Sequence, residues 1–98
     1  PRLSALLQNY PNPFNPNTTI PFAVGHAGEA GWVEVRLDIY NMLGQQVRTV
    51  VSGSLPAGIH RVEWDGRDGA GRDVASGSYV YRLQVGELLQ SRRLMLLR

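Results

Sequence analysis

The chain has 98 residues, of which 43% are apolar and 18% are charged, so it is long enough for one small globular domain and too apolar for a disordered segment. Its net charge of +2 rests on ten arginines and no lysine, and because these are scattered except for the pair Arg92 and Arg93, we expect no nucleic-acid partner. The absence of cysteine excludes disulfides, thiolate metal sites and cysteine nucleophiles, and no apolar run has the length of a membrane-spanning helix.

Residues 8–20 form the first distinctive segment, with three prolines and four asparagines. Each proline removes a backbone donor and favours extended geometry in the residue before it, so this segment cannot be a helix. Tyr10 and Phe14 are too large and apolar for a free linker. We therefore expect an ordered lead-in that contributes the first strand and a crossover, with Tyr10 and Phe14 packed as plugs at one end of a core.

Alternation of apolar and polar residues predicts seven strands, near residues 4–8, 18–24, 32–40, 46–51, 59–64, 79–85 and 88–97. Asn41 and Gly44 indicate a hairpin turn, and the glycine- and proline-rich segments 52–58 and 65–73 indicate loops. The last strand has apolar residues on both faces, which favours a position between layers. No segment shows a helical period. The predicted fold class is all-β, a seven-stranded antiparallel immunoglobulin-like sandwich, with a small open barrel as the alternative.

Catalytic chemistry has few candidate residues in this chain. His26, in the loop of residues 25–28, and His60 are the neutral-pH proton carriers, and neither has an acid and a hydroxyl at a recognisable spacing. We expect His26 to be a solvated surface residue and His60 to be packed at a strand end. The sequence therefore predicts a protein that is not an enzyme.

Two further patterns each have a structural and a functional interpretation. Asp65, Asp68 and Asp73 stand among glycines, which favours tight turns closed by the aspartates, with a calcium site as the weaker alternative. The aromatic residues favour core or cross-strand pairs, with a sugar-stacking platform as the weaker alternative. The residues that would build such a platform are Tyr10, Phe14, Trp32, Trp64, Tyr79 and Tyr81.

The basic and apolar ending also has two interpretations, which the residues alone leave open. One is an edge strand protected by charge, and the other is a recognition surface for a partner that adds a strand or pairs acids with the guanidinium groups. The residues concerned are Arg92, Arg93, Leu94, Met95, Leu96, Leu97 and Arg98.

Four segments in order resemble one known family: residues 7–16, which we call the proline lead, and residues 37–47, 58–66 and 75–83. Together with the ending they resemble the type A C-terminal sorting domain of type IX secretion substrates. The motif residues in these segments are Asn9, Tyr10, Pro11, Asn12, Pro13, Tyr40, Gly44, Trp64, Asp65, Gly66, Gly77 and Tyr79. The family commonly has aspartate at Asn41 and ends in lysines, so positive charge is kept here but lysine-specific chemistry is not.

The resemblance implies an immunoglobulin-like domain at the end of a large secreted protein, often a hydrolase, of a Bacteroidetes-like bacterium. It implies recognition by an outer-membrane translocon, with Arg92–Arg98 as the signal, and removal by a sortase-like peptidase after passage through the periplasm to the cell surface or the medium. Because the chain starts at Pro1, we expect residues 1–98 to be a single domain excised from a longer polypeptide. No cofactor is expected. The functional alternative is an accessory carbohydrate-binding module of a secreted glycosidase.

A second similarity covers residues 64–79. This stretch resembles the immunoglobulin-like part of the flagellar hook-capping protein, which lacks the proline lead. We interpret it as a shared fold and shared turns rather than a shared function.

Overall fold

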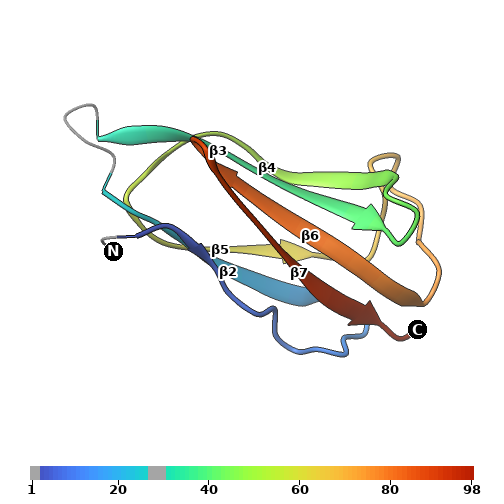
Figure 1. Cartoon of the computed structure of the whole chain (residues 1–98). Coiled ribbons are helices and arrows are strands. Elements are labelled where there is room, and N and C mark those ends of the chain that lie inside the picture. Colours follow the sequence, from blue (N-terminus) through green and yellow to red (C-terminus); the bar gives the residue numbers. More distant parts are fainter. Residues whose placement is uncertain (1–2, 27–30) are drawn as a thin grey trace.

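The computed structural model describes residues 3–26 and 31–98, and this part of the chain consists of strands and loops. Its strands lie in two sheets, one of order β1-β2-β5 and one of order β4-β3-β6-β7, with antiparallel pairing throughout (Figure 1). The bounds are β1 (Ala5–Leu6), β2 (Thr18–Val24), β3 (Trp32–Asn41), β4 (Gln46–Pro56), β5 (Gly58–Trp64), β6 (Gly77–Val85) and β7 (Leu88–Leu96). The predicted immunoglobulin-like sandwich is confirmed, and the barrel alternative is wrong because the strands divide into two separate sheets.

The predicted loop 52–58 is wrong, because β4 continues to Pro56 and only Ala57 separates it from β5. Gly53 remains in the ladder opposite Val35 with a φ of 148°, a value that suits glycine and few other residues. Pro56 ends the strand opposite Trp32, on the edge of its sheet, where the missing N–H costs no ladder bond. The same residues that signal a loop thus mark the point where the chain passes from one sheet to the other.

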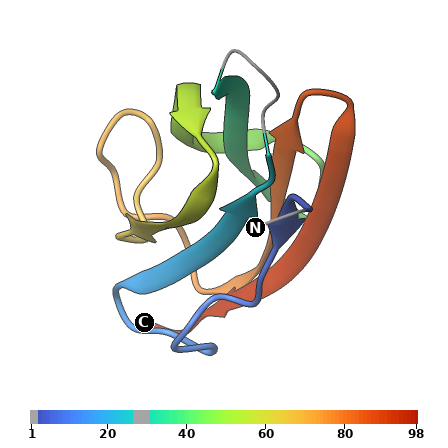
Figure 2. The same cartoon turned by 90° about the vertical axis from the view of Figure 1, so that its left-hand side faces the viewer.

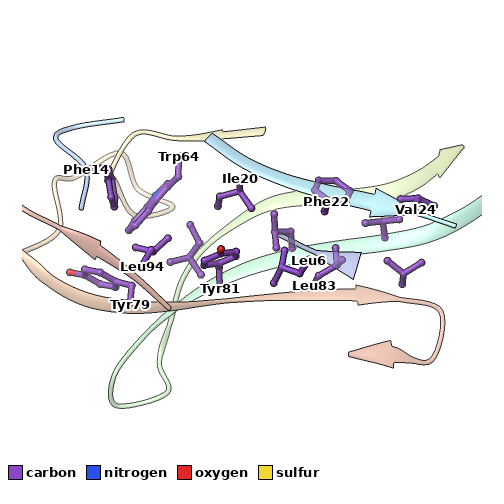
Figure 3. Close-up of a cluster of buried hydrophobic side chains, with 14 of the residues drawn as sticks. Leu6, Phe14, Ile20, Phe22, Val24, Trp64, Tyr79, Tyr81, Leu83 and Leu94 are labelled. Atoms are coloured by element: carbon purple, nitrogen blue, oxygen red, sulfur yellow. The ribbon is translucent and has the colours of Figure 1, made fainter. Parts of the chain in front are cut away.

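The core fills the space between the two sheets, with alternate side chains of β2, β3 and β6 pointing inward (Figure 3). Burial of such side chains is the main source of stability, at about 25 cal/mol per Å² of apolar surface. The buried cluster consists of Leu6, Phe14, Ile20, Phe22, Val24, Val35, Leu37, Ile39, Trp64, Tyr79, Tyr81, Leu83, Val85, Leu94 and Leu96.

The proline lead places one of its two aromatic side chains in this core. Phe14 is 2% exposed and lies against Trp64, with the ring centroids 5.6 Å apart, so the expected plug is confirmed for this residue. For Tyr10 it is wrong, because that side chain is 50% exposed. The backbone of Tyr10 instead forms a two-bond bridge with Thr19, with N···O distances of 2.9 and 2.8 Å.

The last strand is an edge of its sheet rather than a strand between layers, because β6 is the one strand of residues 3–26 and 31–98 that pairs with β7. Its alternation explains the two-faced pattern: Leu94 and Leu96 point into the core, whereas Met95 and Leu97 are 39% and 49% exposed. The first strand is shorter than predicted. After Leu6 regular pairing ends, and the chain runs beside β7 while the Leu7 N–H and the Tyr10 bridge still bond it to β2 (Figure 2).

Candidate functional site

The proline lead and the last strand form one continuous surface, although they are more than eighty residues apart in sequence. Asn12 Oδ1 accepts a hydrogen bond from the Met95 N–H at 2.9 Å. Phe14 then donates its N–H to the Met95 carbonyl and accepts from the Leu97 N–H, both at 3.0 Å. The lead therefore acts as a short parallel partner for the end of β7 and covers part of its edge, the device by which sheets avoid unwanted pairing.

Further contacts tie the start of the chain to β7. Gln8 Nε2 donates to the Arg93 carbonyl at 3.0 Å, and Gln90 Oε1 accepts from the Leu6 N–H at 2.8 Å. Arg92 Nε donates to the Leu6 carbonyl, also at 2.8 Å. These polar contacts hold the two sheets together where they meet at the side of the sandwich.

Asn9 is the polar centre of the lead and is 2% exposed. Its backbone N–H donates to the Tyr81 hydroxyl at 2.9 Å, and its Nδ2 donates to Thr18 Oγ1 at 2.9 Å. The Tyr81 hydroxyl in turn donates to the Leu7 carbonyl at 2.8 Å. Burial raises the pKa of Tyr81, so this hydroxyl stays protonated and available as a donor. Asn9 is thus a structural anchor, whereas Pro11, Asn12 and Pro13 are exposed.

The seven residues predicted for partner recognition separate into three groups. Leu94 and Leu96 are buried in the core and are inaccessible to a partner while the domain is folded. Arg92, Arg93, Met95 and Leu97 are exposed on or beside β7. Arg98 is exposed as a residue, but its guanidinium group turns onto the loop of residues 65–76 and bonds to it.

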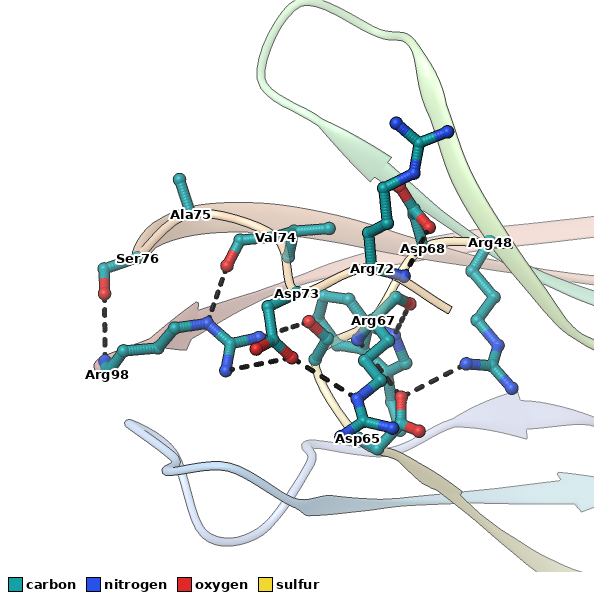
Figure 4. Close-up of polar contacts among 12 residues, drawn as sticks. Arg48, Asp65, Arg67, Asp68, Arg72, Asp73, Val74, Ala75, Ser76 and Arg98 are labelled. Carbon is teal, nitrogen blue, oxygen red and sulfur yellow. Dashed lines mark hydrogen bonds and ion pairs between the residues drawn. The ribbon is translucent and has the colours of Figure 1, made fainter. Parts of the chain in front are cut away.

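Arg98 clamps that loop from several directions (Figure 4). Its Nε donates to the Val74 carbonyl at 2.7 Å, its Nη2 donates to the Gly66 carbonyl, and its Nη1 lies 3.5 Å from Asp73 Oδ1. Gly66 has a φ of 73°, and a Cβ built there would stand 2.8 Å from Arg98 Nη2. The positive φ of the turn favours glycine here, and any larger residue would also push the end of the Arg98 side chain away from its present position.

The three aspartates of the loop have partners of their own. Asp65 pairs with Arg48 at 3.1 Å, and Asp73 pairs with Arg67 at 3.3 Å as well as with Arg98. Asp68 Oδ1 accepts the N–H groups of residues 70 and 72 at 2.9 and 3.0 Å. The bond from the residue 72 amide is the main reason that the pKa of Asp68 is lowered. This geometry supports the turn interpretation. Within residues 3–26 and 31–98, no three acidic or histidine side chains converge as metal ligands would, so calcium binding stays a prediction without geometric support.

Aromatic motif residues hold the same loop to the sandwich. Trp64 Nε1 donates to the Arg67 carbonyl at 2.8 Å, and the Tyr79 hydroxyl donates to the Ala75 carbonyl at 2.5 Å. The Trp64 and Tyr79 rings meet edge to face, with centroids 5.5 Å apart, and burial raises the pKa of Tyr79. Gly77 begins β6 directly after this loop, opposite Leu96.

The sugar-stacking platform is wrong, because four of its six aromatic residues are buried in the core. The two exposed ones cannot act together. Trp32 pairs with Pro56 at one end of the sandwich, whereas Tyr10 pairs with Thr19 at the other. The carbohydrate-binding alternative loses its main support with this arrangement.

Both histidines lie as expected. His60 is half-buried, stacks on Phe22 with ring centroids 5.4 Å apart, and has its Nε2 at 2.9 Å from the Pro56 carbonyl oxygen. His26 is exposed, while residues 27 and 28 of its predicted loop lie outside the described residues.

One surface feature escaped sequence reasoning. Arg82 lies over the Tyr40 ring, 4.9 Å from its centroid, and donates to the Tyr40 hydroxyl at 2.6 Å. The pair borders a hollow of about 300 Å³ on the outer face of the four-stranded sheet, next to the turn in which the Gly44 N–H donates to the Asn41 carbonyl at 3.0 Å. The alternation of β6 predicts that Arg82 lies on the outer face of the sheet, but only the pairing of β3 with β6 reveals its contact with Tyr40.

Three solved structures share this fold. Dimeric latent PorU from Porphyromonas gingivalis matches 99% of this chain with a TM-score of 0.77 and 18% identity. PorZ, described as an essential surface component of the type IX secretion system of the same bacterium, matches 93% with a TM-score of 0.61 and 21% identity. The DNA-bound glycosylase AlkC from Pseudomonas fluorescens matches 97% with a TM-score of 0.55 and 17% identity.

These likenesses show a shared fold over a small part of each neighbour, since the chain spans 9% of PorU, 11% of PorZ and 30% of AlkC. No curated protein matches the chain in sequence. The described part of the chain has no helix that could cross a membrane.

The family comparison matches residues 15–87 to the FlgD Ig-like domain. This match is much wider than residues 64–79, the stretch that resembles the hook-capping protein in sequence, and it covers well over half of the chain. The chain therefore belongs to the FlgD Ig-like domain family.

Proposed function

We propose that this domain is a non-enzymatic sorting signal and surface-attachment domain of a secreted protein, recognised by the type IX secretion machinery. Its partners would be the translocon and a sortase-like peptidase, and its cargo a larger N-terminal protein such as a hydrolase. The domain would pass through the periplasm and reach the cell surface or the medium. It would need no cofactor.

The observation that carries this proposal concerns the two ends of the chain. The family match covers residues 15–87 and so leaves out residues 7–14 of the proline lead and all of β7. The PorU likeness covers 99% of the chain and therefore includes both. These two ends contact each other through Asn12, Phe14 and Met95, so they form a unit that general family membership does not explain. The role of PorZ as an essential surface component of the type IX secretion system supports the same interpretation.

The exposed part of the ending is the surface that a translocon would read. Arg93, Met95 and Leu97 project from the outer side of β7, and Arg92 reaches its edge. Because Leu94, Leu96 and Arg98 have internal contacts, deleting residues 94–98 would damage the fold as well as the signal. A loss of export in that deletion would not identify the recognition surface.

Surface substitutions make a sharper test. Residues 1–98 are fused to a fluorescent cargo with a periplasmic signal in a host that has type IX secretion, and fluorescence is measured in the periplasm, on the surface and in the medium. We expect export of the fusion and its retention in the periplasm when Arg93→Glu and Met95→Glu are combined. Arg61→Glu, on an exposed position of β5, is the control for one charge reversal and should export normally.

Thermal unfolding of the isolated variants checks that they are folded, since exposed substitutions away from the core usually change stability by about 0.5 kcal/mol or less. Retention of the unaltered fusion in the periplasm would refute the sorting role. Normal export of the double variant would refute the assignment of the signal to this face of β7.

A further inference from the structure

The arginines of the domain fall into two classes. Arg36, Arg48, Arg67 and Arg98 form ion pairs with aspartates. Within the described ranges, no carboxylate pairs with Arg82, Arg92 or Arg93. These three are neighbours on β6 and β7, because Arg82 is opposite Ser91 and Val80 is opposite Arg93. Arg61 and Arg72 also form no ion pair, so three of the five unpaired arginines among the described residues lie together at this edge. Asp38, opposite Arg82 in the ladder, is paired with Arg36.

A continuous hollow accompanies this charge. The hollow of about 300 Å³ beside Tyr40 and Arg82 shares Val80 and Ser91 with a second hollow of about 360 Å³, which Arg92 and Arg93 complete. Val80, Tyr40 and Met42 supply apolar surface. None of the described residues that line the two hollows is acidic. The surface therefore suits a ligand that has both negative charge and apolar side chains.

The edge of β7 is open next to these hollows. The lead and Gln8 use the outward groups from the Arg93 carbonyl to the Leu97 N–H. Since backbone groups alternate in an antiparallel ladder, and the register of β6 with β7 is unbroken, the N–H and C=O of Leu89 and Ser91 point outward on the same side as those of Met95. No hydrogen bond from the described residues reaches these groups. Residues 89–93 therefore keep unpaired outward backbone groups over about the usual length of a strand. Leu6 lies beside this half of β7, but it bonds to the side chains of Gln90 and Arg92 and not to these backbone groups.

We propose that the open half of this edge, residues 89–93, binds an extended acidic peptide segment of a partner protein, which adds to β7 as a further strand. The proposal rests on the proposed function, because it names the chemistry by which the secretion machinery would read β7. Backbone bonds would give affinity, and carboxylates beside Arg93 on the outer face and Arg92 on the inner side would give selectivity.

Charge also decides against a second copy of the chain as the occupant. Two copies paired antiparallel about Ser91 would place two Arg92 and two Arg93 side chains within one short ladder. Like charges at such short distances destabilise the pairing of two strands. An acidic strand meets the same arginines with attraction.

The binding test uses the complete chain and a fluorescein-labelled peptide of sequence Glu-Val-Glu-Val-Glu-Val-Glu-Val, followed by anisotropy at low salt. We expect this peptide to bind at least about tenfold more tightly than a version with lysine in place of glutamate. A version with proline in place of valine keeps the charge but cannot pair as a strand, and should also bind at least about tenfold more weakly. Polygalacturonate, a non-peptide polyanion, should compete poorly.

Matched variants locate the site. Arg93→Glu and Ser91→Pro should each weaken binding by about tenfold or more, whereas Arg61→Glu should change it by less than about twofold. Ser91→Pro removes an outward donor and no ladder bond, because proline is tolerated at such edge positions. Hydrogen exchange of the Leu89 and Ser91 amides in the unaltered chain is an independent readout, and both should gain protection when the peptide is bound.

Specific outcomes overturn the proposal. Equal binding of the proline peptide, or strong competition by polygalacturonate, would make the surface a general polyanion site. If Arg61→Glu weakened peptide binding as much as Arg93→Glu does, the binding site could not be assigned to β7. A dimer in sedimentation that Ser91→Pro dissociates would identify a second copy as the occupant. If Ser91→Pro exports its cargo normally while Arg93→Glu with Met95→Glu does not, strand addition fails but the sorting role stands.

Discussion

Replacing Phe14 with alanine tests whether the proline lead is part of the core or a covering that can be removed without loss. The side chain is 2% exposed, and burial of such a ring contributes about 1.5–3 kcal/mol. Its contact with Trp64, at 5.6 Å between centroids, adds roughly 0.5–1.5 kcal/mol, and the cavity left behind adds more. We expect the free energy of unfolding to fall by about 3–5 kcal/mol, a large part of the total of about 5–15 kcal/mol for a domain.

Tyr10→Ala is the matched control, since it removes an aromatic ring four positions away in the same lead. Tyr10 is half exposed, and its two bonds with Thr19 are made by the backbone, so we expect a loss of about 1 kcal/mol or less. Urea denaturation followed by far-ultraviolet circular dichroism measures both variants, with equal slopes required for the comparison. Equal losses for the two variants, or a loss below about 1 kcal/mol for Phe14→Ala, would refute the reasoning.

Three further predictions concern the loop and the buried hydroxyl. Arg98→Ala should lower the free energy of unfolding, measured by urea denaturation, by about 1–3 kcal/mol. Arg98→Lys should recover little of this loss, because the bonds to the Val74 and Gly66 carbonyls need the several N–H groups of a guanidinium. Full recovery with lysine would contradict this geometry. Tyr81→Phe should cost about 1–3 kcal/mol at neutral pH, because the Asn9 N–H and the Leu7 carbonyl lose their partner. Burial raises the pKa of Tyr81 in the folded state, so the contribution of its hydroxyl to stability is complete below roughly pH 10 and is lost as the pH rises through the folded-state pKa. Above that pH, the free energy of unfolding should therefore fall less steeply with pH in Tyr81→Phe than in the unaltered chain. An equal slope in the two proteins would contradict this role of Tyr81. Calcium should leave the melting temperature unchanged, and a rise on addition that a chelator reverses would establish the aspartate loop as a metal site after all.

Local pattern was a good guide to the strands of this domain. The alternation of residues 32–40 and 79–85 predicted which side chains of β3 and β6 face the core, because a strand has a period of two. It was a poor guide to β4, since Gly53 and Pro56 can stand in a loop or in an edge strand, and the choice depends on the neighbour β3. The separation of Tyr10 from Phe14 was equally invisible, because two aromatic residues in one irregular segment have no common period.

The candidate site depended on tertiary structure to a greater degree. Sequence and family resemblance pointed separately to a proline-rich start and a basic ending, but the bond between Asn12 and Met95 joins residues that no local rule relates. The division of the ending into buried leucines, a clamping Arg98 and an exposed Arg93 also followed from contacts with distant segments.

The amino-acid sequence by itself determined an all-β domain, most of its strands and the turns between them, because proline, glycine and alternating side chains act on the backbone within a few residues. Only the tertiary structure decided which sheet edge the proline lead covers, which half of β7 stays open and which arginines have carboxylate partners. Those properties depend on the packing of two sheets against each other, and packing is set by side chains that meet in space rather than along the chain.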